Sequence, residues 1–299
     1  MTHLGTDREA VPDMPNRLGL NGIEFIEYAT TRPQALGHVL ETMGFKPIAR
    51  HRSREVMLYR QGSMNLIVNA HSEDARVSAL VDEKPVISAV AFRVKDALRA
   101  HTRCVELGAW PVPSHAQAME LHIPAIHGPG GSRIYLVDRW TEFSIYDIDF
   151  KPIPGVDQHP PALAGMDYFG LVQYVDPGRS EDWIRYYETM FDFSTVPEDE
   201  RYGILPKGKV LKSPCGQFMW QLIEPDPWME SDRAPENLER IGLGTPDVGQ
   251  AVTLLKSRGV EFIETSSLHP EDRGALTRRE LGSVSFELVH RTGDGQGPT

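Results

Sequence analysis

The chain has 299 residues, which corresponds to about two domains at roughly 150 residues each. Its 40% hydrophobic and 24% charged residues are typical of soluble globular proteins and exclude a disordered or fibrous chain. A net charge of -11 repels nucleic-acid phosphates and anionic membrane surfaces, so we expect neither as a partner.

The N-terminal residues 1–16 are polar and acidic, and we expect a flexible tail there. They contain no apolar segment of the kind that directs secretion, and no stretch of the chain approaches the apolar length of a membrane span. The chain has only two cysteines, too few for a disulfide framework. We therefore expect a cytoplasmic protein.

Apolar periodicity predicts alternating strands and helices along both halves of the chain. The elements predicted in the first half are strands at 23–28, 55–59, 64–69, 86–94, 134–137 and 143–148, with helices at 33–43 and 97–107. The proline-rich segment 151–163 then favours neither helix nor buried strand and is predicted to link two domains. The elements predicted in the second half are strands at 168–174, 210–212, 218–223, 238–244 and 284–289, with helices at 182–190 and 248–257.

A short motif recurs in the two halves. A strand ends at Phe92-Arg93-Val94-Lys95-Asp96 and is followed by a helical segment, and Leu243-Gly244-Thr245-Pro246-Asp247 has the same context. The recurrence of this motif, each time between a strand and a helical segment, indicates an internal repeat. We therefore predict an α+β fold in which one βαβββ-like unit is used four times. The predicted domains are 17–150 and 164–292, followed by a tail at 293–299.

Several segments resemble the 4-hydroxyphenylpyruvate dioxygenase family. The segments that carry the resemblance are Gly19–Tyr28, Met43–Phe45, Ala91–Asp96, Leu136–Arg139 and Ser144–Phe150, and it continues at lower density through Glu287 to Arg291. The family belongs to the vicinal oxygen chelate superfamily, which also contains glyoxalase-like proteins. The resemblance implies two tandem domains, each a half-barrel of paired βαβββ modules, and a role in the metabolism of aromatic compounds.

The resemblance also implies a non-haem Fe(II) site in the C-terminal domain, built from two histidines and one carboxylate. This chain has Tyr168 and Arg240 where the family has the histidines, and only Glu287 matches. Arginine stays protonated and offers no lone pair to a metal. The remaining histidines near these positions, His159, His269 and His290, do not fall on the positions of the missing ligands, so we expect no family-type metal site and no cofactor.

If Tyr168, Arg240 and Glu287 converge, the site has a chemistry that needs no metal. Arg240 would bind a small aromatic or 2-oxo carboxylate, Glu287 would act as general base, and Tyr168 as acid or oxyanion donor. Such a site suits isomerisation or dehydration beside a carbonyl. Alternatively, Arg240 and Glu287 pair with each other and fill a vacated metal cavity.

Three functions therefore stay open. The first is metal-independent acid and base chemistry of the lyase or isomerase type on a dioxygenase-like scaffold. The second is an Fe(II)-dependent dioxygenase of aromatic 2-oxo acids whose ligands the sequence does not reveal. The third is a non-catalytic small-molecule-binding protein. The family's C-terminal helical segment has no counterpart after Glu287, so we expect a more open pocket or one closed by a second copy in a homo-oligomer.

Overall fold

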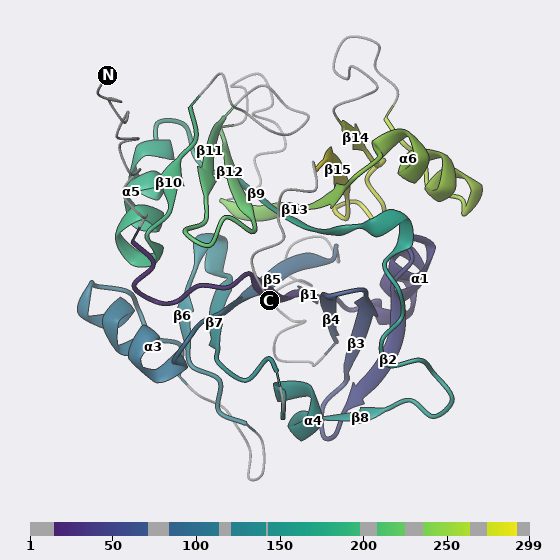
Figure 1. Cartoon of the computed structure of the whole chain (residues 1–299), viewed down its shortest axis with the longest axis horizontal. Coiled ribbons are helices and arrows are strands. Elements are labelled where there is room, and N and C mark those ends of the chain that lie inside the picture. Colours follow the sequence, from purple (N-terminus) through teal and green to yellow (C-terminus); the bar gives the residue numbers. More distant parts are fainter. Residues whose placement is uncertain are drawn as a thin grey trace, which may run out of the picture.

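The computed structural model describes residues 15–70, 84–113, 121–141, 143–197, 208–224, 236–263 and 274–291. Two mixed β-sheets occupy separate halves of the molecule, and the longer helices lie at its periphery (Figure 1). Among the described residues, no helix has the length and apolar character needed to cross a lipid bilayer.

The first sheet has eight strands in the order β6-β7-β5-β1-β4-β3-β2-β8. Its strands are β1 (Ile23–Ala29), β2 (Lys46–His51), β3 (Val56–Gln61), β4 (Met64–Asn69), β5 (Val86–Arg93), β6 (Ala125–His127), β7 (Arg133–Val137) and β8 (Phe150–Pro152). Its helices are α1 (Pro33–Thr42), α3 (Ala97–Glu106) and α4 (Ile145–Asp149), and a 3-10 turn, η1, spans Pro129–Gly131.

The second sheet has seven strands in the order β10-β11-β12-β9-β13-β15-β14. Its strands are β9 (Asp167–Tyr174), β10 (Ser194–Thr195), β11 (Lys209–Lys212), β12 (Met219–Ile223), β13 (Asn237–Thr245), β14 (Gly274–Leu276) and β15 (Phe286–His290). Its helices are α5 (Ser180–Phe191) and α6 (Val248–Ser257), and a second 3-10 turn, η2 (Leu163–Gly165), precedes β9.

The predicted repeat is present in both sheets. Each of four units begins with a strand and a helix, namely β1-α1, β5-α3, β9-α5 and β13-α6. The first strands of neighbouring units pair antiparallel, β1 with β5 and β9 with β13, and each also pairs in parallel with a later strand of its own unit. The predicted α+β class is therefore confirmed.

The recurring motif has a physical role at the start of two helices. The carboxylate of Asp96 accepts a hydrogen bond from the backbone N–H of Arg99 at 2.9 Å, and that of Asp247 accepts one from Gln250 at 2.8 Å. Each aspartate is an N-cap, which satisfies an amide that the first helical turn leaves without a partner. The repeat was thus visible in the sequence because both units need the same cap.

One predicted element is wrong, and the strands β2, β6, β8, β10 and β14 were not predicted. The segment predicted as a strand at 143–148 contains helix α4, because Ser144 and Asp147 form a capping box that begins a helix. Strand β2 was not predicted because Pro47 and its flanking charged residues hide the alternation of a strand. Residues 1–14 of the predicted N-terminal tail and the tail predicted at 293–299 lie outside the described residues.

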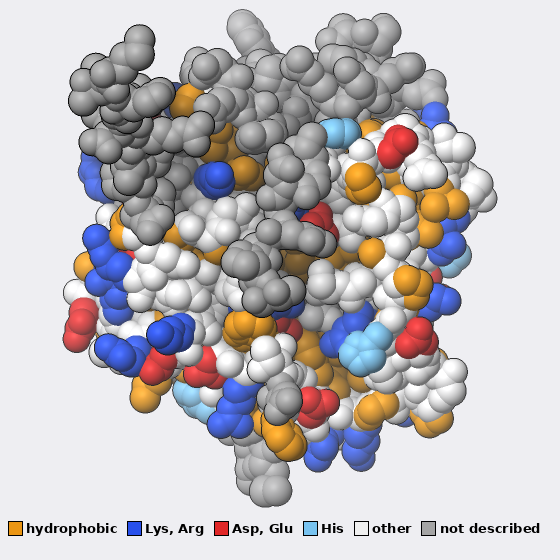
Figure 2. All heavy atoms as spheres, viewed as in Figure 1, with side chains coloured by type: hydrophobic (Ala, Val, Ile, Leu, Met, Phe, Trp, Pro, Cys, Tyr) orange, Lys and Arg blue, Asp and Glu red, His pale blue; other side chains and the backbone are white. Residues whose placement is uncertain are grey.

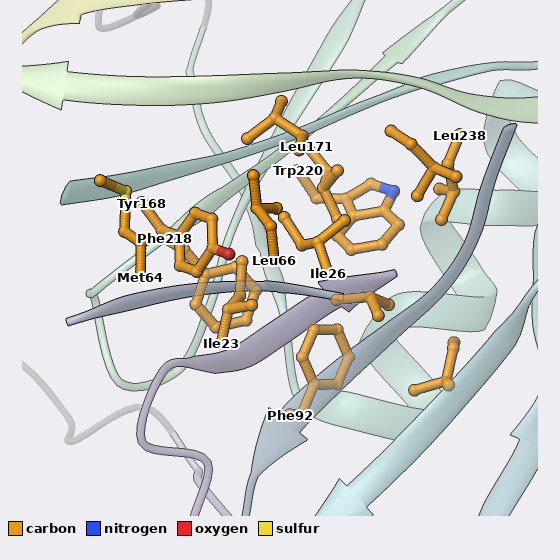
Figure 3. Packing of buried hydrophobic residues seen from close by; sticks show 14 of the residues in the cluster. Ile23, Ile26, Met64, Leu66, Phe92, Tyr168, Leu171, Phe218, Trp220 and Leu238 are labelled. Atoms are coloured by element: carbon orange, nitrogen blue, oxygen red, sulfur yellow. The ribbon is translucent and has the colours of Figure 1, made fainter. Parts of the chain in front are cut away.

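One hydrophobic cluster joins the two sheets. Ile26, Leu66 and Phe92 of the first sheet pack with Leu171 and Trp220 of the second, and Figure 3 shows these side chains between the strands of both sheets. The Phe92 ring is 5.3 Å from the Phe218 ring and 6.1 Å from that of Trp220. Burial of these rings supplies the main free energy that holds the halves together.

The opposite face of the first sheet carries a second, smaller cluster. It contains Phe25, Leu58, Ala91, Tyr146 and Phe150. We call the face of each sheet that lies away from the shared core its available face.

Candidate functional site

Arg240 and Glu287 meet on the available face of the second sheet. In the parallel pair β13–β15, Gly242 lies opposite Glu287, and Arg240 is two residues before Gly242, so both side chains lie on one face. The Nε of Arg240 donates to Oε2 of Glu287 at 2.9 Å, and both side chains are 3% exposed. The structure therefore brings together two of the three predicted site residues, as a direct ion pair.

Little space is left beside this pair. A cavity of about 20 Å³ lies next to Glu287, which is room for roughly one water molecule. Gly170, which lines it, approaches β12 so closely that a Cβ there would lie 2.0 Å from the carbonyl oxygen of Met219. Among the described residues, this cavity admits a single polar atom of a ligand but not an aromatic ring.

One donor of Arg240 is unsatisfied. Its Nη2 is buried and has no hydrogen-bond partner among the described residues. An unpaired buried donor costs about 1–3 kcal/mol. A water or ligand oxygen that accepts from Nη2 would recover this free energy, so the pair retains one position at which a small acceptor is favoured.

The structure does not bring Tyr168 together with this pair. Tyr168 lies opposite Leu243 in the sheet, beyond a register shift that separates it from Gly242. Its ring packs in the shared core near Met64 and Phe218 (Figure 3). Its hydroxyl donates to the backbone carbonyl of Asn65 in the first sheet, and burial raises its pKa well above the usual range. Tyr168 is therefore a contact between the two sheets.

As far as the described residues go, Tyr168, Arg240 and Glu287 do not fit an Fe(II) centre. The phenol of Tyr168 lies in the shared core, the guanidinium of Arg240 has no lone pair, and the carboxylate of Glu287 accepts from that guanidinium. In the part of the chain that the structure describes, no three His, Cys, Asp or Glu side chains are placed to hold a metal ion. His290 is exposed at the end of β15, and His269 lies outside the described residues.

A second, larger cavity lies on the available face of the first sheet, and the sequence did not predict it. It has a volume of about 690 Å³, and its lining includes Glu24, Arg60, Arg93 and Trp140. The face shown in Figure 2 carries Lys, Arg and His side chains around apolar surface in its lower half, where the first sheet lies. A sequence signal for this cavity exists. Arg60 lies two positions after Leu58 and Arg93 two positions after Ala91, and Leu58 and Ala91 belong to the second cluster. Residues two positions apart on a strand share a face, so both arginines lie on the face of that cluster.

Comparison with known proteins identifies relatives along most of the chain. The model of the family described as hydroxyphenylpyruvate dioxygenase, N-terminal, matches residues 14–151. A 4-hydroxyphenylpyruvate dioxygenase of Pseudomonas sp. (strain P.J. 874) is 44% identical over 93% of this chain and 91% of that protein. The hemolysin VllY of Vibrio vulnificus is 30% identical over 94% of this chain and 92% of that protein.

A solved structure shares the fold. It is a fusion of a xylose isomerase-like TIM barrel with a 4-hydroxyphenylpyruvate dioxygenase, and it matches with a TM-score of 0.75 and 24% identity. The match covers 96% of this chain and 51% of the fusion protein. This likeness confirms the predicted fold of tandem half-barrel domains.

Proposed function

The chain belongs to the 4-hydroxyphenylpyruvate dioxygenase family, and from this premise we propose that it is a small-molecule-binding member in which a buried ion pair replaces the Fe(II) centre. In this proposal the protein binds a small aromatic or 2-oxo carboxylate and does not carry out iron-dependent dioxygenation. The observation that carries the proposal is the contact between Arg240 and Glu287, 2.9 Å long and 3% exposed on both sides.

Electrostatics favours the ion pair over a metal at this position. Two like unit charges about 4 Å apart repel by roughly 4 kcal/mol near a protein surface, and by more in a dry interior. A divalent cation bound to Glu287 carries two unit charges, so its repulsion from the Arg240 guanidinium would be about twice this value. Among the described residues, Glu287 is the one family ligand that the sequence retains, and the family's arrangement uses three.

Acid and base catalysis without a metal is the second candidate, and the unpaired Nη2 of Arg240 favours it. A substrate oxygen could accept from Nη2 while Glu287 removes a proton. Tyr168 takes no part in this version, since its hydroxyl is bonded to Asn65. Binding is preferred to catalysis because Arg240 already occupies a carboxylate oxygen that a base would use.

Oxygen uptake tests the proposal. The purified protein is reconstituted with Fe(II) under anaerobic conditions and then mixed with 4-hydroxyphenylpyruvate in oxygenated buffer. The 44% identical relative from Pseudomonas sp. is treated in parallel as the positive control. We expect oxygen uptake by the relative and none above background by this chain. Uptake that depends on iron and on substrate would contradict the proposal.

The same preparation separates the two candidates. After treatment with a chelator, the protein is incubated with aromatic and 2-oxo carboxylates, and their isomerisation or dehydration is followed by NMR. Turnover that survives chelation and is abolished in Glu287→Gln would establish the acid and base enzyme. We expect no turnover in the unmodified protein or in Glu287→Gln.

A further inference from the structure

We propose that the cavity of the first sheet binds an aromatic carboxylate, with the guanidinium groups of Arg60 and Arg93 as the carboxylate-binding donors. This site lies in the first half of the chain, whereas the family resemblance implies a metal site in the C-terminal domain. The inference rests on the proposed function for the class of ligand, and it adds the place where that ligand binds.

The size of the cavity suits such a ligand. Its volume of about 690 Å³ falls within the 300–1,000 Å³ that is typical of small-molecule sites. The cavity beside Glu287 is only about 20 Å³. A whole aromatic acid therefore fits the cavity of the first sheet but not the small cavity beside Glu287.

The charge of the lining favours an anion. Among the described residues of the lining, the cationic side chains are Arg52, Arg60, Arg93 and Lys151, and the carboxylates are Glu24 and Asp147. This excess of positive charge occurs in a chain whose net charge is -11. A concave site of one sign concentrates ligands of the opposite sign, so the cavity attracts anions against the field of the protein as a whole.

Arg93 is held in place with donors to spare. Its Nε donates to Oε2 of the buried Glu24 at 2.6 Å, and its guanidinium lies 5.6 Å from the centre of the Trp140 ring. Neither Nη nitrogen has an acceptor among the described residues. Because Nε is occupied, the two Nη groups form the remaining fork that can bind both oxygens of a carboxylate.

Arg60 is fixed in a similar way. Its Nε donates to Oδ1 of Asn65 at 2.7 Å and its Nη1 to the carbonyl of Gln158 at 2.9 Å. The Asn65 side chain in turn donates to the backbone carbonyl of Glu24 at 3.0 Å. A network that already fixes both arginines lowers the entropic cost of binding. The Nη2 of Arg60 has no acceptor among the described residues and is the third available donor.

Aromatic and aliphatic side chains supply the apolar part of the lining. Trp140, Tyr146 and Phe150 belong to it, together with the fully buried Leu58. The rings of Tyr146 and Phe150 meet edge to face with centroids 5.8 Å apart, and the Arg60 guanidinium lies 5.3 Å from the Tyr146 ring. Cationic donors beside aromatic rings match a ligand that joins a carboxylate to a flat ring.

Calorimetric titration with benzoate tests the proposal, and benzamide serves as the uncharged probe of the same shape. We expect saturable binding of benzoate and binding of benzamide that is weaker by about tenfold or more, since a hydrogen bond to a charged group contributes about 1.5–3 kcal/mol. The tryptophan fluorescence of the protein should change with benzoate, and Trp140→Phe should remove most of that change.

Two variants locate the binding. Arg60→Gln should weaken benzoate binding by about tenfold or more. Arg93→Gln alone would leave Glu24 buried without its partner, so Glu24→Gln is combined with Arg93→Gln, and this double variant should show a similar loss. Arg139→Gln is the matched control, because Arg139 is exposed and does not line the cavity. Circular dichroism melting checks that each variant folds.

The outcomes separate this inference from the proposed function. Benzoate binding that survives in both cavity variants but is lost in Arg240→Gln would overturn the inference and leave the proposed function standing. Loss of binding in the cavity variants together with iron-dependent oxygen uptake would support the inference and overturn the proposed function. An absence of saturable benzoate binding to the unmodified protein would overturn the inference.

Discussion

Removal of one partner from the Arg240–Glu287 pair should destabilise the protein strongly. Both side chains are 3% exposed, so Arg240→Met removes the guanidinium that donates to the buried Glu287 carboxylate. A single buried charge stripped of its partner costs about 3–5 kcal/mol. This is a large part of the roughly 5–15 kcal/mol by which a protein of ordinary stability is folded. The assay is urea unfolding at neutral pH, followed by fluorescence and circular dichroism, with the free energy of unfolding extrapolated to water.

A double-mutant cycle gives the control. Arg240→Met combined with Glu287→Leu replaces the ion pair by apolar side chains, and such a replacement is often neutral or stabilising. We expect the double variant to unfold near the wild-type midpoint, with a coupling free energy of about 3 kcal/mol or more between the two positions. A loss below about 1 kcal/mol in Arg240→Met, the value of an exposed ion pair, would refute the assignment of a buried pair.

Three further predictions concern single residues. Tyr168→Phe removes the hydroxyl that donates to Asn65; it should lower the free energy of unfolding by about 1–3 kcal/mol because the buried carbonyl loses its donor, while benzoate affinity measured by calorimetry stays unchanged. Asp247→Ala removes the N-cap of α6 and should cost about 1 kcal/mol in urea unfolding, whereas an unchanged midpoint would argue against the cap. Burial raises the pKa of Cys104 to about 11, so at pH 8 it stays a protonated, buried thiol and should react with Ellman's reagent only after unfolding. Cys215, which is half-buried, is the internal comparison, and fast labelling of Cys104 in the native protein would contradict its burial.

The pairing of Arg240 with Glu287 could be predicted from the sequence because it depends on the repeat and on the pairing of two neighbouring strands. The repeat places both residues on neighbouring strands of one unit, and parallel pairing brings them within reach. The structure shows the direct contact between the two side chains and places the Tyr168 hydroxyl on Asn65 instead; that the pair fills a vacated metal cavity stays a prediction. The N-caps at Asp96 and Asp247 were likewise visible, since a cap acts within a single helical turn.

The position of Tyr168 could not be predicted in the same way. A register shift in the pairing of β9 with β13 turns its side chain into the shared core, and a shift of one residue reverses the face of every side chain beyond it. The cavity of the first sheet was missed because one of the segments that line it was predicted as the wrong element. Its lining combines β1, β3, β4 and β5 with the segment around Tyr146, and that segment was predicted as a strand rather than as helix α4.

Some expectations stay predictions. The domain boundaries at 17–150 and 164–292 and a homo-oligomer stay proposals. Gel filtration coupled to light scattering would test the last of these.

Anaerobic titration of the purified protein with Fe(II) by calorimetry tests the central claim most directly, because the claim is that a guanidinium takes the place of the metal on Glu287. We predict no saturable heat of binding, and an iron content after desalting that does not exceed that of Glu287→Gln. Saturable binding of stoichiometric iron that disappears in Glu287→Gln would contradict the account.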